Sequence, residues 1–173
     1  MKHLKTFVVA AAFLVFGCAF AQQDAHPKFV EGKGLAQNRE IGGKFELRAT
    51  HNERGETVGR FLFQVGNEET PRQVTIELKR PMSLEFAGDG SVFKGRGIMV
   101  VREGRDIRRF EGNITVRAAD LAPPAGDNGS PDPNVPHDRL VVRFEADRSD
   151  VTYTFEGIVT RGDIKIGPKA TAG

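Results

Sequence analysis

The feature that most constrains this chain is a regular alternation of apolar and polar side chains in short runs. In the clearest run, Phe45, Leu47 and Ala49 alternate with charged or polar residues. Successive side chains of a β-strand point to opposite faces, so this pattern predicts strands with one buried face. After residue 21 no segment shows helical periodicity. The chain is therefore expected to be all-β.

Turn-forming residues separate the alternating runs. Two interruptions fall inside longer apolar patterns. Arg80-Pro81 is expected to end a strand because proline cannot donate to a ladder, and Arg161-Gly162-Asp163 is expected to form a turn. With these breaks the sequence predicts an antiparallel β-sandwich of about nine or ten strands. A small β-barrel is the alternative.

The longest pair of runs, Ser91 to Arg117, is predicted to form one hairpin. A two-residue type I′ turn at Glu103-Gly104 would place Gly97 opposite Phe110. A Phe-x-Gly motif also recurs, and each ring would share a strand face with its glycine. We interpret it as ring-over-glycine packing in a bent sheet, with an apolar ligand cavity as the alternative. The motif occurs at Phe86-Gly88, Phe93-Gly95, Phe110-Gly112 and Phe155-Gly157.

The N-terminus has the features of an export signal. Lys2 and Lys5 precede an apolar run that ends near Gly17, and Ala19-Phe20-Ala21 matches the small-x-small pattern of a signal peptidase site. A spanning helix needs about 20 apolar residues, which this run does not supply. We therefore expect a periplasmic or extracellular protein without a transmembrane helix. In the alternative, Val15 to Cys18 forms a lipobox and Cys18 anchors a lipoprotein.

These features divide the chain into segments. Cleavage after residue 21 leaves a chain of single-domain size. The segments are 1–21, signal peptide; 22–28, flexible leader; 29–167, one β domain with a Pro/Gly/Asp-rich loop at 120–137; and 168–173, disordered tail.

Charge and cysteine content limit the classes of function. Removal of Lys2 and Lys5 leaves as many basic as acidic residues, because the whole chain has 25 Lys and Arg against 23 Asp and Glu. A nucleic-acid partner, which needs a clustered basic excess, is therefore not expected. Cys18 is the only cysteine, so the mature chain is expected to lack disulfides and thiol chemistry.

Arginines do cluster at the predicted hairpin tip. Acidic residues lie between them, which predicts a solvated surface of ion pairs. A patch for phosphate or an anionic surface is the alternative. The residues are Arg102, Arg105, Arg108 and Arg109, with Glu103, Asp106 and Glu111.

Catalysis is not expected. The sequence has no Gly-x-Ser-x-Gly elbow, and His26, His51 and His137 fall in a leader, a turn and a loop. A hydrolase that uses paired carboxylates on a sheet face is an alternative. Its candidates are Glu77, Glu85, Glu111, Glu145 and Glu156.

The loop at 120–137 is the one place where a metal is considered. Calcium binds about 6–8 oxygen ligands of the kind that Asp and Asn supply. Asp and Asn are also ordinary turn residues, so a loop without metal is the favoured interpretation and calcium the alternative. The calcium ligands would be Asp120, Asp127, Asn128, Asp132 and Asp138. No other cofactor is predicted.

Several segments resemble secreted bacterial β domains of the post-COAP type. They are Asp138 to Phe144, Val151 to Tyr153, Gly162 to Ile166 and the Phe-x-Gly-x-Gly strand at Val92 to Gly97. The resemblance implies an exported, non-catalytic β module and carries over no catalytic residue. The expected function is a binding or structural module whose partner is a protein or envelope component. A small barrel carrying an apolar ligand is the main rival.

Overall fold

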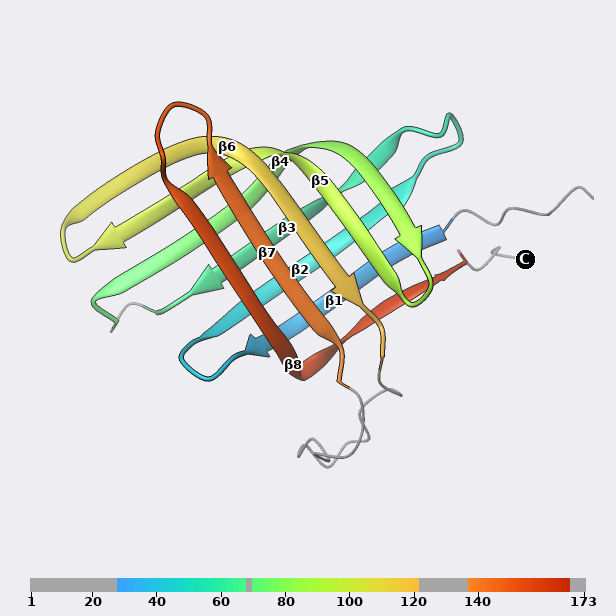
Figure 1. Cartoon of the computed structure of the whole chain (residues 1–173), viewed down its shortest axis with the longest axis horizontal. Helices are drawn as coiled ribbons and strands as arrows, with labels where there is room; N and C mark the ends of the chain where they lie inside the picture. Colours follow the sequence, from blue (N-terminus) through green and yellow to red (C-terminus); the bar gives the residue numbers. More distant parts are fainter. Residues whose placement is uncertain (1–27, 68–69, 122–136, 169–173) are drawn as a thin grey trace, which may run out of the picture.

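The protein is a closed barrel of eight antiparallel strands (Figure 1). The computed structural model describes residues 28–67, 70–121 and 137–168. Within these ranges there is no helix, and so none that is long and apolar enough to cross a membrane. The strands are β1 (Lys28–Gln37), β2 (Gly42–His51), β3 (Thr57–Val65), β4 (Arg72–Ala87), β5 (Gly90–Glu103), β6 (Asp106–Ala119), β7 (Arg139–Ala146) and β8 (Thr152–Pro168).

The predicted signal peptide, the tail from residue 169 and most of the loop at 120–137 lie outside the described residues. Cys18 is among them, and the described ranges contain no cysteine, so no disulfide holds the barrel together.

The all-β prediction is confirmed, but the observed architecture is the small barrel and not the sandwich. Two predicted breaks lie inside continuous strands. Pro81 is in β4, where the pairing with β5 shifts register on both sides of it. Gly162 is in β8, where its φ of 87° bends the strand. Bulges and bends of this kind absorb residues that cannot follow a regular ladder, so two pairs of predicted strands each become one.

The barrel closes because β8 pairs with two different neighbours. Its first part, Thr152 to Ile158, pairs with β7. Its second part, Ile158 to Pro168, pairs with β1. In Figure 1 the blue first strand and the red last strand run side by side. A sandwich and a barrel both have one wet and one buried face, so the alternation alone does not distinguish them.

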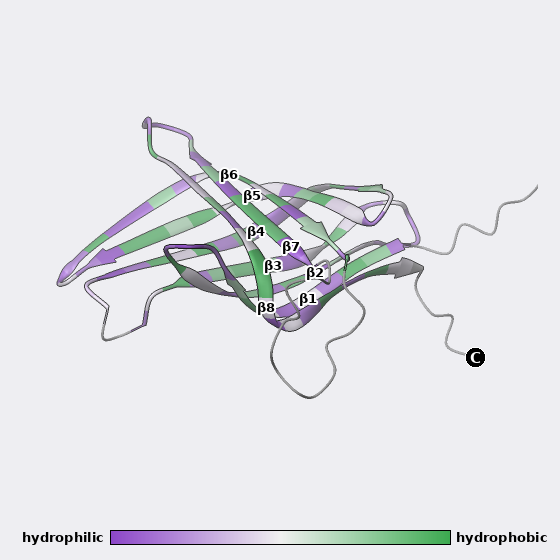
Figure 2. Ribbon diagram, turned by 60° about the horizontal axis from the view of Figure 1, so that its bottom comes forward, coloured by the Kyte–Doolittle hydropathy of each residue, from purple (hydrophilic) through white to green (hydrophobic). Residues whose placement is uncertain are grey.

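The core fills the centre of the barrel. Phe45, Leu47 and Ala49 are buried as their alternation predicts, and Figure 2 shows hydrophobic and hydrophilic residues alternating along the strands. Large rings dominate the centre: Phe63 lies 4.7 Å from Phe155 between ring centroids and stacks on Phe61.

The predicted register of the long hairpin is wrong by two residues. The turn is formed by Gly104 and Arg105, with Gly104 at a φ of 60°. Gly97 therefore lies opposite Gly112, and Phe110 lies opposite Met99. A shift of two leaves every side chain on its predicted face, which is why the inward positions survive the error.

Ring-over-glycine packing occurs at only one of the four Phe-x-Gly motifs, Phe155-Gly157. The atoms nearest to a Cβ on Gly95 or Gly112 belong mainly to the backbone of the neighbouring strand, and Gly88 lies in a turn with open space around it. A Cβ on Gly157 would lie 2.7 Å from the ring of Phe155. At Gly97 the side chain over the glycine is that of Ile114 instead of Phe110, and a Cβ on this glycine would lie 2.5 Å from Cδ1 of Ile114.

Candidate functional site

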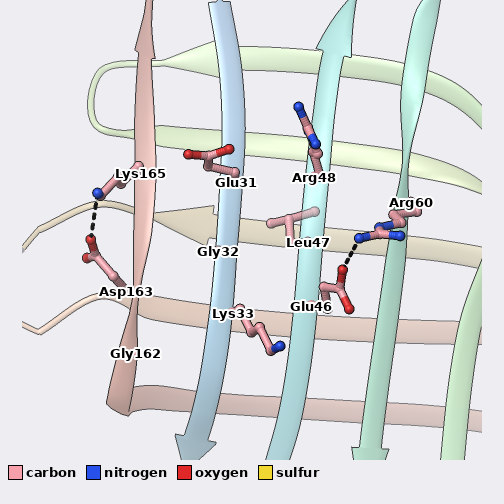
Figure 3. Close-up of a pocket in the computed structure, with 10 residues that line it drawn as sticks. All are labelled: Glu31, Gly32, Lys33, Glu46, Leu47, Arg48, Arg60, Gly162, Asp163 and Lys165. Carbon is pink, nitrogen blue, oxygen red and sulfur yellow. Dashed lines mark hydrogen bonds and ion pairs between the residues drawn. The ribbon is translucent and has the colours of Figure 1, made fainter.

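The outer wall of β8, β1, β2 and β3 carries an open hollow of about 380 Å³ (Figure 3). Bare backbone at Gly32 and Gly162 forms part of its floor, together with Leu47. Charged side chains surround this floor. They are Glu31, Lys33, Glu46, Arg48, Arg60, Asp163 and Lys165.

The strand register arranges these charges in two rows whose sign alternates across β8, β1 and β2, whereas Arg60 on β3 has the same sign as Arg48 opposite it. The row nearer the chain termini runs Lys165, Glu31, Arg48 and Arg60 across β8, β1, β2 and β3. The next row runs Asp163, Lys33 and Glu46. Opposite charges on adjacent strands stabilise a sheet by about 0.2–1 kcal/mol per pair. The pattern therefore supports the register and gives the hollow charges of both signs.

Only part of this charge is committed to ion pairs. Arg60 pairs with Glu46, and Lys165 lies 3.8 Å from Asp163 (Figure 3). Glu31, Lys33 and Arg48 have no ion pair within the described ranges. These three side chains are therefore free to contact a partner.

A second polar cluster closes the seam beside β8. The part of β8 that extends past the start of β7 has no strand on that edge among the described residues. Two aspartates accept backbone hydrogen bonds there instead. Asp138, only 4% exposed, accepts hydrogen bonds from the backbone N–H groups of Leu121 and Ile164, both at 2.9 Å. Asp120 accepts one from the N–H of Ile166 at 3.0 Å.

Asp163 joins this cluster at the edge of the hollow. Burial raises the pKa of its carboxyl, and the negative charge of Asp138 and a hydrogen bond with that residue raise it further. Lys165 opposes this change and Asp120 adds to it, both with smaller effects. The protonated form of the Asp163 carboxyl is therefore favoured beside Asp138.

The calcium prediction is only partly covered by this geometry. Asp127, Asn128 and Asp132 lie outside the described residues. Asp120 and Asp138 do come together at the seam, where both accept backbone hydrogen bonds. Within the described ranges no group of three or more His, Cys, Asp or Glu residues is arranged to hold a metal. Calcium remains a prediction.

Of the three histidines considered for catalysis, His51 has local partners in the described part of the chain. His26 lies outside the described residues. His51 has Nε2 3.0 Å from the carbonyl oxygen of Leu84, and its ring packs edge-on against Phe86. His137 is half-buried at the start of the last described range.

Among the candidate acids, three form ion pairs on the outer face of the barrel. They are Glu77 with Lys79, Glu85 with Lys94, and Glu145 with Arg143. Glu111 and Glu156 occupy exposed positions on β6 and β8. All five acids thus occupy positions that are typical of the solvent-exposed face of a sheet.

The residues of the hollow were not singled out from the sequence. Glu31, Lys33, Asp163 and Lys165 come together through the pairing of the first and last strands, and no local motif marks that pairing. The only sequence signal is polar residues at outward positions, which nearly every strand of the chain shares.

The fold defines the protein as a small, closed, antiparallel β-barrel with its centre filled by side chains. Within that class, comparison with known proteins finds no matching family model, no matching curated protein and no matching solved structure. The resemblance to post-COAP domains therefore stays a prediction.

Proposed function

We propose that this protein is an exported, non-catalytic binding module that recognises a protein partner in the bacterial envelope or outside the cell. The contact surface is the outer hollow over β8, β1, β2 and β3. The observation that supports this most directly is the contrast between a centre filled by aromatic rings and an outer wall whose charges are partly unpaired. Export is proposed from the signal-like residues 1–21.

The filled centre favours this function over an apolar-ligand carrier. A carrier needs space for its ligand inside the barrel. Here the rings of Phe63 and Phe155 stand over Gly43 and Gly157, and the side chain of Ile114 stands over Gly97. Protein interiors are packed as densely as organic crystals, so a ligand would have to displace these side chains.

The two signs of charge in the hollow favour a protein partner. A ligand of one sign would be attracted by Lys33 and Arg48 and repelled by Glu31 and Glu46, or the reverse. A protein surface can present both signs in matching order, and such complementarity gives specificity. The hollow is also open, which suits a protruding side chain or turn of another protein.

Affinity capture from bacterial envelope extracts tests this proposal. Wild type, Arg48→Glu and Arg117→Glu are immobilised, since both arginines are exposed, outward and without an ion pair among the described residues. A like charge placed against a partner costs several kcal/mol. Arg48→Glu should therefore lose, by more than about tenfold, a protein that wild type and Arg117→Glu retain. Equal capture by all three would contradict the proposal.

Thermal unfolding in the presence of ligands separates the rival functions. A ligand that binds only the folded state raises the melting temperature. A rise with fatty acids would support the carrier instead. A rise with calcium that a chelator reverses would support the predicted calcium site of Asp120, Asp127, Asn128, Asp132 and Asp138.

A further inference from the structure

The tip of the β5–β6 hairpin extends beyond the body of the barrel. It is the yellow turn at the left-hand end of Figure 1. β6 begins to pair with β7 only at Gly112, so residues 106–111 have a strand neighbour on one side alone. Every residue from Arg102 to Arg109 is exposed. The tip is thus the part of this hairpin most able to reach another surface.

The register sorts the charges of the tip onto two faces. Glu103 lies two residues after the buried Val101 and directly opposite Asp106, so both acids belong to the inward-facing set. Glu103 pairs with Arg108 at 2.7 Å and with Arg72 at 3.2 Å. The predicted surface of ion pairs therefore exists, but it lies on this face of the tip.

The outer face of the tip carries a different set of side chains. Arg102 lies opposite Ile107, and Arg109 lies opposite the half-buried Val100. Ile107 is 60% exposed. Neither Arg102 nor Arg109 has an ion pair within the described ranges. We call Arg102, Ile107 and Arg109 the tip patch, and Arg105 in the turn adds a third cation beside it.

We propose that the tip patch docks on the surface of a membrane that contains anionic phospholipids. Guanidinium groups match phosphate in shape and charge and form paired hydrogen bonds with it. An exposed isoleucine between them would enter the boundary between headgroups and acyl chains, where apolar side chains of peripheral proteins are buried. A soluble anion would use the arginines but would give the isoleucine nothing to bury against.

This inference goes beyond the proposed function, because it uses strands on another part of the wall. The hollow lies over β8, β1, β2 and β3, whereas the tip patch belongs to β5 and β6. The barrel would then hold itself at an anionic bilayer by the hairpin and present the hollow to a protein partner.

Vesicle co-sedimentation tests the tip patch. The barrel strands run from Lys28 to Pro168, so protein beginning at Gln22 is used and the signal-like residues cannot contribute. Vesicles contain either equal parts of phosphatidylglycerol and phosphatidylcholine or phosphatidylcholine alone. Each arginine near an anionic surface contributes about fivefold to partitioning. Arg102→Gln/Arg109→Gln should therefore bind the anionic vesicles about 25-fold more weakly than wild type.

Two further variants make the test specific. Arg54→Gln/Arg117→Gln removes the same charge at the opposite end of the barrel and should bind as wild type does. Ile107→Ser keeps all the arginines and should weaken vesicle binding by about tenfold, the effect of no longer burying one large aliphatic side chain.

Three results would overturn the proposal. In the first, wild type binds the anionic vesicles no better than vesicles of phosphatidylcholine alone. In the second, Arg102→Gln/Arg109→Gln binds the anionic vesicles as well as wild type does. In the third, Ile107→Ser binds as well as wild type and a soluble polyanion such as heparin abolishes the binding. The last result would identify a polyanion site. Failure here is distinguishable from failure of the proposed function, because Arg48→Glu should still bind vesicles and the tip variants should still capture the protein partner.

Discussion

Replacement of Gly97 by alanine should destabilise the barrel strongly, although it adds only one methyl group. A Cβ at this position would lie 2.5 Å from Cδ1 of Ile114 and 2.9 Å from Cα of Leu78, and it would also collide with the carbonyl oxygen of Glu77. The Ile114 side chain can rotate away. The Glu77 carbonyl cannot, because β4 is held between β3 and β5 at this level.

The expected cost follows from these contacts. Overpacking a dense core costs about 1–3 kcal/mol, and the fixed backbone of β4 places Gly97→Ala in the upper half of that range. Each kcal/mol changes the melting temperature by about 2–4 °C in a chain of this size. We therefore expect a decrease of about 4–12 °C.

Gly42→Ala is the matched control. It adds the same methyl group on β2, where the nearest atom is Cδ1 of Leu35 at an ordinary 3.6 Å. The φ angle of Gly42 is not in the left-handed region. Gly42→Ala should therefore be neutral, or stabilise the protein by about 0.4–1 kcal/mol because alanine lowers the conformational entropy of the unfolded chain.

Urea and thermal unfolding followed by circular dichroism would measure both variants, since the chain has no tryptophan for fluorescence. Gly97→Ala/Ile114→Val, which removes Cδ1, should recover only part of the loss. A Gly97→Ala protein that melts at or above the wild-type temperature would refute the close approach of β4 and Ile114 to this glycine.

Other predictions concern the titrating and buried polar groups. Because the pKa of Asp163 is raised in the folded state, its contribution to stability is present below the unfolded pKa and is lost as pH rises through the folded pKa. Asp163→Asn keeps a hydrogen-bond donor for Asp138 and cannot ionise. Its free energy of unfolding in urea should therefore rise relative to that of wild type as pH increases from about 4 towards neutrality. The same pH dependence of stability in both proteins would contradict this. Asp138→Ala leaves two backbone N–H groups without their acceptor and should cost about 2–5 kcal/mol in the same assay, whereas Asp138→Asn should lose less. Burial raises the pKa of the Tyr153 hydroxyl more than Arg72 lowers it, so the phenolate absorbance of this only tyrosine should appear above pH ~10, with loss of stability there; a midpoint at the ordinary value would count against the burial.

The sequence was sufficient to predict the buried face of most strands, although Met82, expected to continue the inward alternation with Leu84 and Phe86, is 63% exposed. Phe45, Leu47 and Phe144 are buried because alternation depends only on the local strand. It was not sufficient to count the strands. Pro81 and Gly162 have the composition of turns, and whether such a residue ends a strand or only bends it depends on the neighbouring strands.

The two candidate surfaces differ in how far sequence could predict them. The hollow depends on β1 meeting β8, so Glu31 and Lys165 become neighbours through a pairing that no short motif encodes. The tip patch is local, and alternation alone places Arg102 on the opposite face from Glu103. Along the chain, however, the two signs of charge are interleaved. The arginines that have no ion pair among the described residues become evident only when each face of the hairpin is considered separately.

The closing pair of strands also determines how the chain must fold. The hydroxyl of Thr160 donates to the carbonyl oxygen of Leu35, a contact between residues 125 positions apart. Contacts of such long range are formed late and slowly, because the chain must first lose the entropy of a large loop. Until β8 reaches β1, the sheet has two unpaired edges that can add a strand from another molecule. We therefore expect closure to be the step at which productive folding and aggregation diverge.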